Sequence, residues 1–381
     1  MIYLDYAATT PVDARVLDAM LPYFNASFGN PSSVHRYGQV AEAAVDSARE
    51  TVASVLHCRA DEIIFTSCGS ESDNLALRGA MMAGRKNNRT WLLTSRVEHH
   101  AVSKTAEQLE KYFGVQVEWL PVDARGMVTP EAMRAAVCDA TALASVMLAN
   151  NEIGTINPIL ELATICHEHG ILFHTDAVQA AAYLDVNVQS LGVDLLSLGS
   201  HKFYGPKGVG ALYVKKGTGL VPHNTGGGQE FGLRAGTQNV PYIVGFAEAF
   251  RLTAQEREQR VAHVQPLRDQ IIGRVLEEVP DSQLTGHPEN RLPNHASFVF
   301  KDVDGNLLLQ LLDANGFACS SGSACKTGNP EPSEVITSLG LTRDWALGSL
   351  RITLGVNSTA EQIDSFLQVL PMLIEKARSL K

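Results

Sequence analysis

Short apolar runs alternate with stretches of helical periodicity over much of this chain, and the alternation limits the folds that it can adopt. Strand-like runs lie at residues 62–66, 91–95, 115–120, 142–150, 171–175 and 194–198. Helical patterns separate most of them. Strands arranged in this way pair in a mostly parallel sheet that helices cover on both faces. The pattern therefore predicts an α/β fold.

The helical segments also have recognisable starts and ends. Helical periodicity is present at residues 38–56, 70–84, 100–113 and 158–169, and Thr129-Pro130 marks the start of one more helix. The run Ser70-Glu71-Ser72-Asp73 fits a capping box at the start of the second of these helices.

The regular alternation of strands and helices ends at about residue 255. A long charged helix is predicted at 256–278, followed by a strand at 296–300, a helix near 306–314, a strand at 350–354 and a closing helix from Ala360. We therefore expect a large domain over residues 13–255, with residues 1–12 and 256–381 forming a smaller α+β domain.

Size and charge exclude several classes of protein. The chain has 381 residues, of which 45% are apolar, so it can bury a large core without disulfide bonds. A net charge of −10 opposes direct binding to nucleic acid. No apolar run approaches the 18 or so residues of a membrane span, and the first residues lack a signal-peptide pattern, so we expect a cytoplasmic protein. The six cysteines have no paired spacing.

Polar residues gather where the predicted strands end. Residues 67–70, Asn150-Asn151, Asp176 and residues 200–202 each follow a strand-like run. Ligands of open parallel sheets bind outside the carboxyl ends of the strands. The sequence therefore predicts one site at this edge. No G-x-G-x-x-G or G-x-x-x-x-G-K-[ST] fingerprint is present, which disfavours dinucleotide and nucleoside triphosphate cofactors.

Lys202 carries the clearest chemical signal. It lies beside Ser200 and His201, after a buried strand and before a glycine-rich turn, which suits a lysine that binds an aldehyde cofactor. Asp176 suits either the cap of a helix at 177–184 or a carboxylate facing a pyridinium nitrogen. Ser70 suits either a helix cap or, with the neighbouring backbone N–H groups, a phosphate site.

The histidines do not predict a metal site. His99-His100 and His167-Glu168-His169 both lack the i, i+4 spacing of helical zinc ligands. His99 follows a predicted strand at the same edge as the other polar residues. We expect its ring to stack on a planar cofactor and to act as an acid or base.

Eight motifs together resemble the cysteine desulfurases of the NifS/IscS type, within the class V aminotransferase family. In chain order they occupy residues 3–11, 29–35, 98–99, 150–154, 174–179, 200–208, 234–237 and 320–325, the last reading Ser-Ser-Gly-Ser-Ala-Cys. Single motifs are weak, but the ordered set covers nearly the whole chain.

The resemblance implies a homodimeric enzyme of fold type I that uses pyridoxal 5'-phosphate. Lys202 would bind the cofactor aldehyde, His99 would stack on the ring, Asp176 would face the pyridine nitrogen and Gln179 the ring hydroxyl. The phosphate would be held by Ser70, His201 and, from the other subunit, Thr237, and Gly69 and Ser200 would also contact the cofactor. Asn151 would contact the cofactor and, with Arg351, the substrate carboxylate. Cys325 would accept sulfur from L-cysteine as a persulfide, giving L-alanine.

Two departures from the family pattern fall at the phosphate site. Gly199 stands where the family usually has serine, and Ser200 would have to replace the missing hydroxyl. Cys68-Gly69-Ser70 stands where Gly-Ala-Thr is common. Both departures concern single phosphate contacts and leave the predicted cofactor unchanged.

Cys325 separates three functional hypotheses. Ser, Gly and Pro residues around it disfavour regular structure and suit a thiol that reaches both the cofactor and an external acceptor. That acceptor would be a transiently bound protein, such as an iron-sulfur scaffold or a thiolation relay protein. A selenocysteine lyase or another lyase or aminotransferase would not need the thiol, and a sulfur-relay scaffold with weak turnover would not need the lysine.

Overall fold

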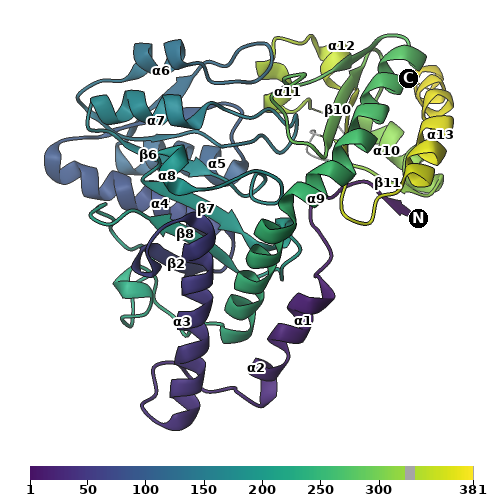
Figure 1. The fold of residues 1–381 in the computed structure, drawn as a ribbon. Coiled ribbons are helices and arrows are strands. Elements are labelled where there is room, and N and C mark those ends of the chain that lie inside the picture. Colours follow the sequence, from purple (N-terminus) through teal and green to yellow (C-terminus); the bar gives the residue numbers. More distant parts are fainter. Residues whose placement is uncertain (322–330, 381) are drawn as a thin grey trace.

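A seven-stranded sheet forms the centre of the larger part of the molecule. The structure, a computed structural model, describes residues 1–321 and 331–380 (Figure 1). The strand order is β2-β8-β7-β6-β5-β3-β4. The strands are β2 (Ile63–Thr66), β3 (Trp91–Ser95), β4 (Gln116–Leu120), β5 (Thr141–Ser145), β6 (Leu172–Asp176), β7 (Leu195–Gly199) and β8 (Gly210–Val214).

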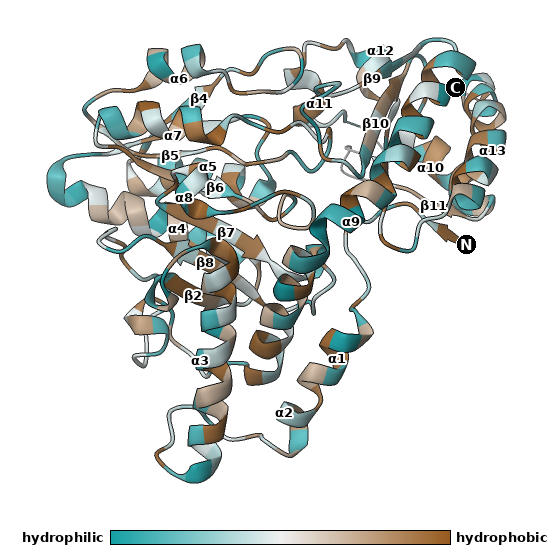
Figure 2. Ribbon diagram, viewed as in Figure 1, coloured by the Kyte–Doolittle hydropathy of each residue, from teal (hydrophilic) through white to brown (hydrophobic). Residues whose placement is uncertain are grey.

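Most of this sheet is parallel. Strands β7, β6, β5, β3 and β4 run in one direction, whereas β8 is antiparallel to both β7 and β2. Strands β2, β7 and β8 are largely brown in Figure 2 and fully buried, as expected for strands covered on both faces, whereas the edge strand β4 is partly exposed. The predicted, mostly parallel α/β sheet is thereby confirmed.

Helices surround the large sheet and extend beyond it. They are α1 (Ala14–Met20), α2 (Pro22–Asn25), α3 (Arg36–Leu56), α4 (Gly69–Gly84), α5 (His100–Phe113), α6 (Pro130–Ala136), α7 (Ile159–Glu168) and α8 (Val188–Leu191). Thr129 caps α6 with its hydroxyl, and Pro130 is the first residue of that helix, as predicted.

A second, smaller layer holds the rest of the chain. Its strands are β9 (Ser282–Leu284), β10 (His295–Phe300) and β12 (Ser349–Thr353), in the order β12-β10-β9, and a separate parallel pair of β1 (Ile2–Tyr3) and β11 (Phe317–Ala318). Its helices are α10 (Gly305–Ala314), α11 (Glu334–Ser338), α12 (Arg343–Ala346) and α13 (Ala360–Ser379).

The helix α9 (Val240–Glu278) connects the two layers. It packs against α1 and α3 at one end and against β9, β10 and α13 at the other (Figure 1). We expected this helix to begin only at residue 256. The part of α9 before residue 256 is mostly apolar and lacks the polar face that marks a helix in a sequence. Phe246 and Phe250, in this early part, are fully buried against Phe203, with ring centroids 5.3 Å from Phe203 in both cases. The aromatic cluster fixes the residue that follows Lys202.

Three local predictions were wrong. Residues 177–184 form turns instead of a helix. Helix α4 begins at Gly69 with Cys68 as its N-cap residue, so Ser70 lies inside the first turn and the predicted capping box is absent. Strand β8 was not predicted. Its first residue, Gly210, directly follows a glycine-rich turn, so the sequence does not mark where the turn ends and the strand begins.

Candidate active site

A cavity of about 320 Å³ opens at the carboxyl ends of β6 and β7 and at the start of α4. Most residues predicted from the sequence lie on its wall. The predicted residues that line it are Gly69, Ser70, His99, Asn151, Asp176, Gln179, His201, Lys202 and Arg351. The edge of a parallel sheet therefore brings together side chains that are far apart in the sequence, although their individual roles toward a cofactor stay predictions.

Lys202 ends a short 3-10 helix, η3 (Ser200–Lys202), that continues from β7. Its Nζ donates hydrogen bonds to the carbonyl oxygens of Ala7, at 2.5 Å, and Ala8, at 2.8 Å. Burial and the nearby Arg351 charge lower the pKa of Lys202 to about 8. About a tenth of this amine is therefore neutral at pH 7, far more than for an ordinary lysine, and the neutral form is the one that attacks an aldehyde or takes a proton.

Asp176 is the last residue of β6 and is buried. Its Oδ1 accepts a hydrogen bond of 2.8 Å from the backbone N–H of Val178, so the carboxylate does stabilise the following turn. Burial raises the pKa of Asp176, while the nearby His99 and Lys202 oppose this rise. The cap and the cavity-facing role coexist in one side chain.

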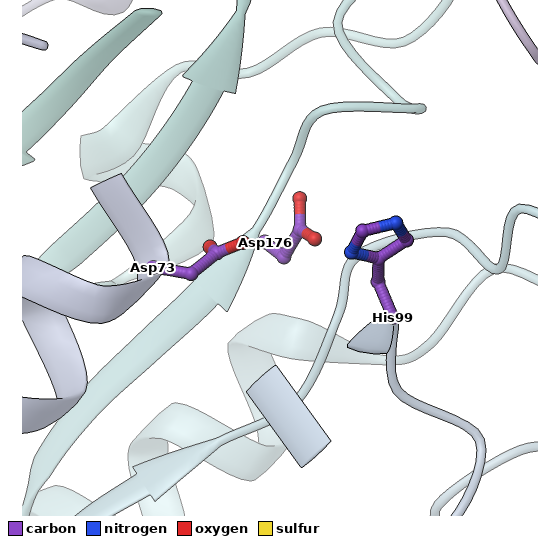
Figure 3. A group of neighbouring side chains, drawn as sticks. All are labelled: Asp73, His99 and Asp176. Carbon is purple, nitrogen blue, oxygen red and sulfur yellow. The ribbon is translucent and has the colours of Figure 1, made fainter. Parts of the chain in front are cut away.

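Asp73, His99 and Asp176 converge on one point of the cavity (Figure 3). One polar atom from each lies within 4.8 Å of the other two. At this separation two ionised carboxylates repel by about 3.5 kcal/mol at an effective dielectric constant of ~20. Ionisation of both acids at the same time is therefore unfavourable in free energy. The same three groups could each offer one ligand atom to a cation, and the expectation that no metal binds here stays a prediction.

His99 is the N-cap residue of α5. Its Nδ1 accepts a hydrogen bond of 3.1 Å from the N–H of Ala101, which leaves Nε2 as the ring nitrogen that can carry a proton. Partial shielding of the ring by the surrounding protein lowers the pKa of His99, and the nearby Asp176 charge opposes this shift. A neutral ring at neutral pH suits stacking on a planar group and proton exchange.

The start of α4 is suited to an anion. Its N-cap residue, Cys68, makes no side-chain hydrogen bond to the helix, and Gly69 and Ser70 both line the cavity. The first N–H groups of a helix attract phosphate through their hydrogen-bonding capacity and the helix dipole. A Cβ at Gly69 would meet Val178 Cγ2 at 2.7 Å, so the close approach of this turn requires glycine.

Arg351 enters the cavity from β12 of the smaller layer. Its Nη1 donates to the carbonyl oxygen of Asn151 at 2.9 Å, and its Nη2 donates to Asp5 at 2.8 Å. Its Nε is buried and has no hydrogen-bond partner among the described residues. The guanidinium is thus held at the cavity wall. Its role in binding a substrate carboxylate stays a prediction.

Two further cavity residues are held by the N-terminal segment. The Nε2 of Gln179 donates to the carbonyl oxygen of Ala7 at 2.8 Å, and His201 Nδ1 lies 3.2 Å from the Thr9 hydroxyl. Burial and the nearby Lys202 charge lower the pKa of His201 to about 4, so its ring is neutral at neutral pH. Residues 7–9 therefore position three of the predicted side chains at once.

Three predicted residues do not lie on this wall. Ser200 is buried beneath Gly205, whose added Cβ would meet its Oγ, and it does not line the cavity. Its role as a replacement for the hydroxyl missing at Gly199 stays a prediction. Thr237 is exposed and lines a separate hollow. Cys325 lies outside the described residues.

Arg234, in the motif at residues 234–237, forms an ion pair within the chain. Its Nε lies 2.9 Å from Glu71 Oε1, and both side chains are largely buried. The pair ties the segment that carries Thr237 to the first turn of α4.

Sequence reasoning missed Asp73. We interpreted it as part of a capping box, whereas it lies one turn into α4 and is 1% exposed. Asp73, Leu77 and Ala80 share the buried face of the helix, and a carboxylate on such an apolar face is the signal that could have identified it.

Comparisons with known proteins agree with this geometry. The sequence profile described as aminotransferase class-V matches residues 2–366. The chain belongs to the class V aminotransferase family. A protein named cysteine desulfurase IscS from Dictyoglomus turgidum is 46% identical over 379 residues, covering all of this chain and 96% of the relative.

Solved structures extend the likeness to three dimensions. A NifS-like protein superposes with a TM-score of 0.91 at 37% identity and covers 98% of this chain and 99% of its own. SspA in complex with cysteine superposes with a TM-score of 0.82 at 35% identity and covers 94% of this chain and 100% of its own. The predicted fold type I is confirmed by these likenesses. Among the described residues, the structure contains no helix long and apolar enough to cross a membrane.

Proposed function

We propose that this protein is a cysteine desulfurase that uses pyridoxal 5'-phosphate to move the sulfur of L-cysteine onto Cys325, with release of L-alanine. The observation that supports this most is the cavity in which Lys202 and Asp176 face Arg351. An amine that binds an aldehyde, an acid for a ring nitrogen and a cation for a carboxylate are there together. The similarity to proteins named cysteine desulfurase supports the choice of substrate.

The residues of the cavity fit the cofactor. Lys202 would bind its aldehyde, Asp176 would face the ring nitrogen, His99 would stack on the ring, and the start of α4 would hold the phosphate. Bound there, the cofactor would supply an aldehyde that condenses with amines and a ring that withdraws electrons from the substrate Cα.

The chain's own groups would then carry out the remaining work. Arg351 would bind the substrate carboxylate, and the neutral Lys202 amine would take the proton from Cα. The Cys325 thiolate would attack the substrate sulfur, so that an S–S bond forms as the Cβ–S bond breaks and its electron pair stays with Cβ. Return of protons to the carbon atoms gives L-alanine, and no external oxidant or reductant is needed.

We also propose a homodimer in which Thr237 reaches the phosphate of the neighbouring subunit. Thr237 does not line the cavity of its own chain. Large apolar side chains on and around α1, α2 and α3 are exposed, among them Phe28 at 65% and Val34 at 91%. Exposed apolar groups of this size suit contact with a second copy.

The acceptor of the sulfur is a transiently bound protein in this proposal, such as an iron-sulfur scaffold or a thiolation relay protein. The net charge of −10 opposes direct binding to nucleic acid and so favours delivery to a protein, and we expect the reaction to occur in the cytoplasm.

One incubation tests the reaction and separates the other hypotheses. Purified protein with L-cysteine and a thiol reductant is expected to release sulfide and L-alanine in equal amounts, with visible absorbance from the bound cofactor. Pyruvate or a transaminated product in place of L-alanine would indicate another lyase or an aminotransferase. A strong preference for L-selenocysteine would indicate a selenocysteine lyase, and a single turnover without release would indicate a relay scaffold.

A further inference from the structure

Asp73 is a buried acid that the proposed reaction does not use. It projects from α4 to the cavity wall, beside Asp176 (Figure 3). Its Oδ1 is shielded from solvent and has no hydrogen-bond partner among the described residues. An orphaned carboxylate oxygen at such a place needs either a proton of its own or a donor.

None of the ionisable groups around Asp73 carries a stable positive charge at neutral pH. The ionisable groups that face it are Asp176, Glu98, Cys68, His174 and His99. His174 Nε2 lies 3.7 Å from Asp73 Oδ1, but burial lowers the pKa of this histidine to about 3, so it is neutral. Burial also raises the pKa of Glu98 to about 8, which leaves Glu98 mostly neutral at pH 7.

A chain of hydrogen bonds fixes the direction of the donors around Asp73. The His174 ring lies 2.8 Å from the Ser145 hydroxyl through Nδ1 and 3.0 Å from the Ser197 hydroxyl through Nε2. The Ser197 hydroxyl also lies close enough to Asp73 to lower the pKa of this acid. The arrangement in which every group is satisfied has Ser145 donating to Nδ1, Nε2 donating to Ser197, and Ser197 donating to the Asp73 carboxyl.

We propose that Asp73 is a positioning residue that holds the single proton of an Asp73–Asp176 pair, so that Asp176 alone presents a negative charge to the cavity. The two acids are unequal in their surroundings. Asp176 accepts the N–H of Val178 and lies near Lys202, and both favour its ionised form. Asp73 has only the Ser197 hydroxyl, and burial together with the Asp176 charge raises its pKa well above the usual range.

The consequence for the site rests on the proposed function. A neutral Asp73 leaves one anion, not two, opposite the ring nitrogen of the cofactor, and its proton can hydrogen bond to Asp176 and hold that carboxylate in place. Asparagine imitates a protonated aspartic acid in shape, charge and hydrogen-bonding capacity. Asp73→Asn is therefore the informative substitution.

The first measurement uses the protein without cofactor and does not depend on turnover. The infrared difference spectrum between wild type and Asp73→Asn at pH 7 is expected to show loss of a C=O band of a protonated carboxylic acid. Asp139→Asn, at an exposed aspartate in a turn, is the matched control and is expected to lose carboxylate bands. Loss of carboxylate bands in Asp73→Asn as well would overturn the proposal.

The second measurement uses the holoenzyme. The visible absorption of the bound cofactor changes with pH, and the midpoint of this change reports its proton affinity. In Asp73→Asn this proton affinity is expected to differ from the wild-type value by no more than roughly twofold. A tenfold or larger change would mean that a charge was removed from the pair, which contradicts the proposal. An enzyme that meets both expectations but makes no L-alanine would refute the proposed function and leave the shared proton standing.

Ser197→Ala provides an independent test if Asp73→Asn does not fold. It removes the hydroxyl donor to Asp73 and leaves the carboxyl itself. The acid band is expected to shift in frequency and to persist at pH 7. Its complete absence in both wild type and Ser197→Ala would overturn the proposal.

Discussion

Lys202 donates a 2.5 Å hydrogen bond to the carbonyl oxygen of Ala7, although 195 residues separate the two in the chain. The N-terminal segment thus holds the amine in the cavity before any substrate arrives. A backbone acceptor attracts the ammonium form without adding a full negative charge, so it fixes the position of Nζ and still permits the low pKa that burial imposes.

Lys202→Ala is expected to abolish visible cofactor absorbance and release of L-alanine, because no other lysine among residues 1–321 and 331–380 lines the cavity. Lys207→Ala removes an exposed lysine five residues away and should leave both unchanged. Borohydride reduction of the wild type followed by peptide mapping checks the assignment directly. Label on any lysine other than Lys202 would contradict it.

The stability of the cofactor-free protein should depend on pH through Lys202. Between about pH 8 and pH 10.4, the unfolded chain holds a proton on this lysine that the folded chain has released. The free energy of unfolding of the wild type, relative to Lys202→Ala, should therefore rise with pH in this window, by at most about 3 kcal/mol. Urea unfolding at several pH values measures it, and a constant or falling difference would show that the amine is not desolvated.

Cys325→Ser should keep the cofactor spectrum and its response to L-cysteine but lose sulfide and L-alanine production. Cys319→Ser is the matched control. Burial raises the pKa of the Cys319 thiol, which makes it a poor nucleophile, so most activity should remain. Mass spectrometry after brief exposure to L-cysteine should find added sulfur on Cys325. Added sulfur on Cys319, or full turnover by Cys325→Ser, would reverse the assignment.

Thr237→Ala should weaken cofactor binding roughly tenfold or more, since a hydrogen bond to a charged group contributes about 1.5 kcal/mol or more. The dimer itself should persist. Thr164→Ala, at an exposed threonine of α7, is the control. Titration of cofactor into the cofactor-free variants and light scattering provide the two measurements. A fully active monomer of the wild type would refute the shared site.

Sequence patterns predicted the side of the sheet on which the site lies, and the structure shows why. Asp176 ends β6 and Asn151 lies in the loop after β5, and both strands belong to a parallel sheet whose carboxyl ends meet at one edge. The alternation of strands and helices was therefore sufficient to bring the two residues together. Asp73 could not be found in this way, because its role comes from the packing of one helix face against β6 and β7. The carbonyl oxygen of Ala7 leaves no trace in the sequence, since every residue has one.

Local competition explains the errors. Asp176 does accept a backbone N–H as a cap would, but the residues after it turn back over the sheet instead of coiling into a helix. The early part of α9 lacks the polar face that makes a helix visible in a sequence, because it is buried against Phe203 and its neighbours. Where both faces of an element are covered, periodicity carries little information.

Helix α9 gives the molecule a mechanical property that its two sheets would not have separately. Its 39 residues correspond to about 58 Å of continuous helix, so it acts as a strut that spans from one sheet to the other. Phe203, which follows Lys202, packs against the early part of this helix, and β10, the strand that pairs with the Arg351 strand β12, packs against its later part. A tilt or bend of the helix would therefore change the separation of Lys202 and Arg351. Pro266 is the position at which this helix bends most easily, because its ring nitrogen has no hydrogen to donate to the preceding turn.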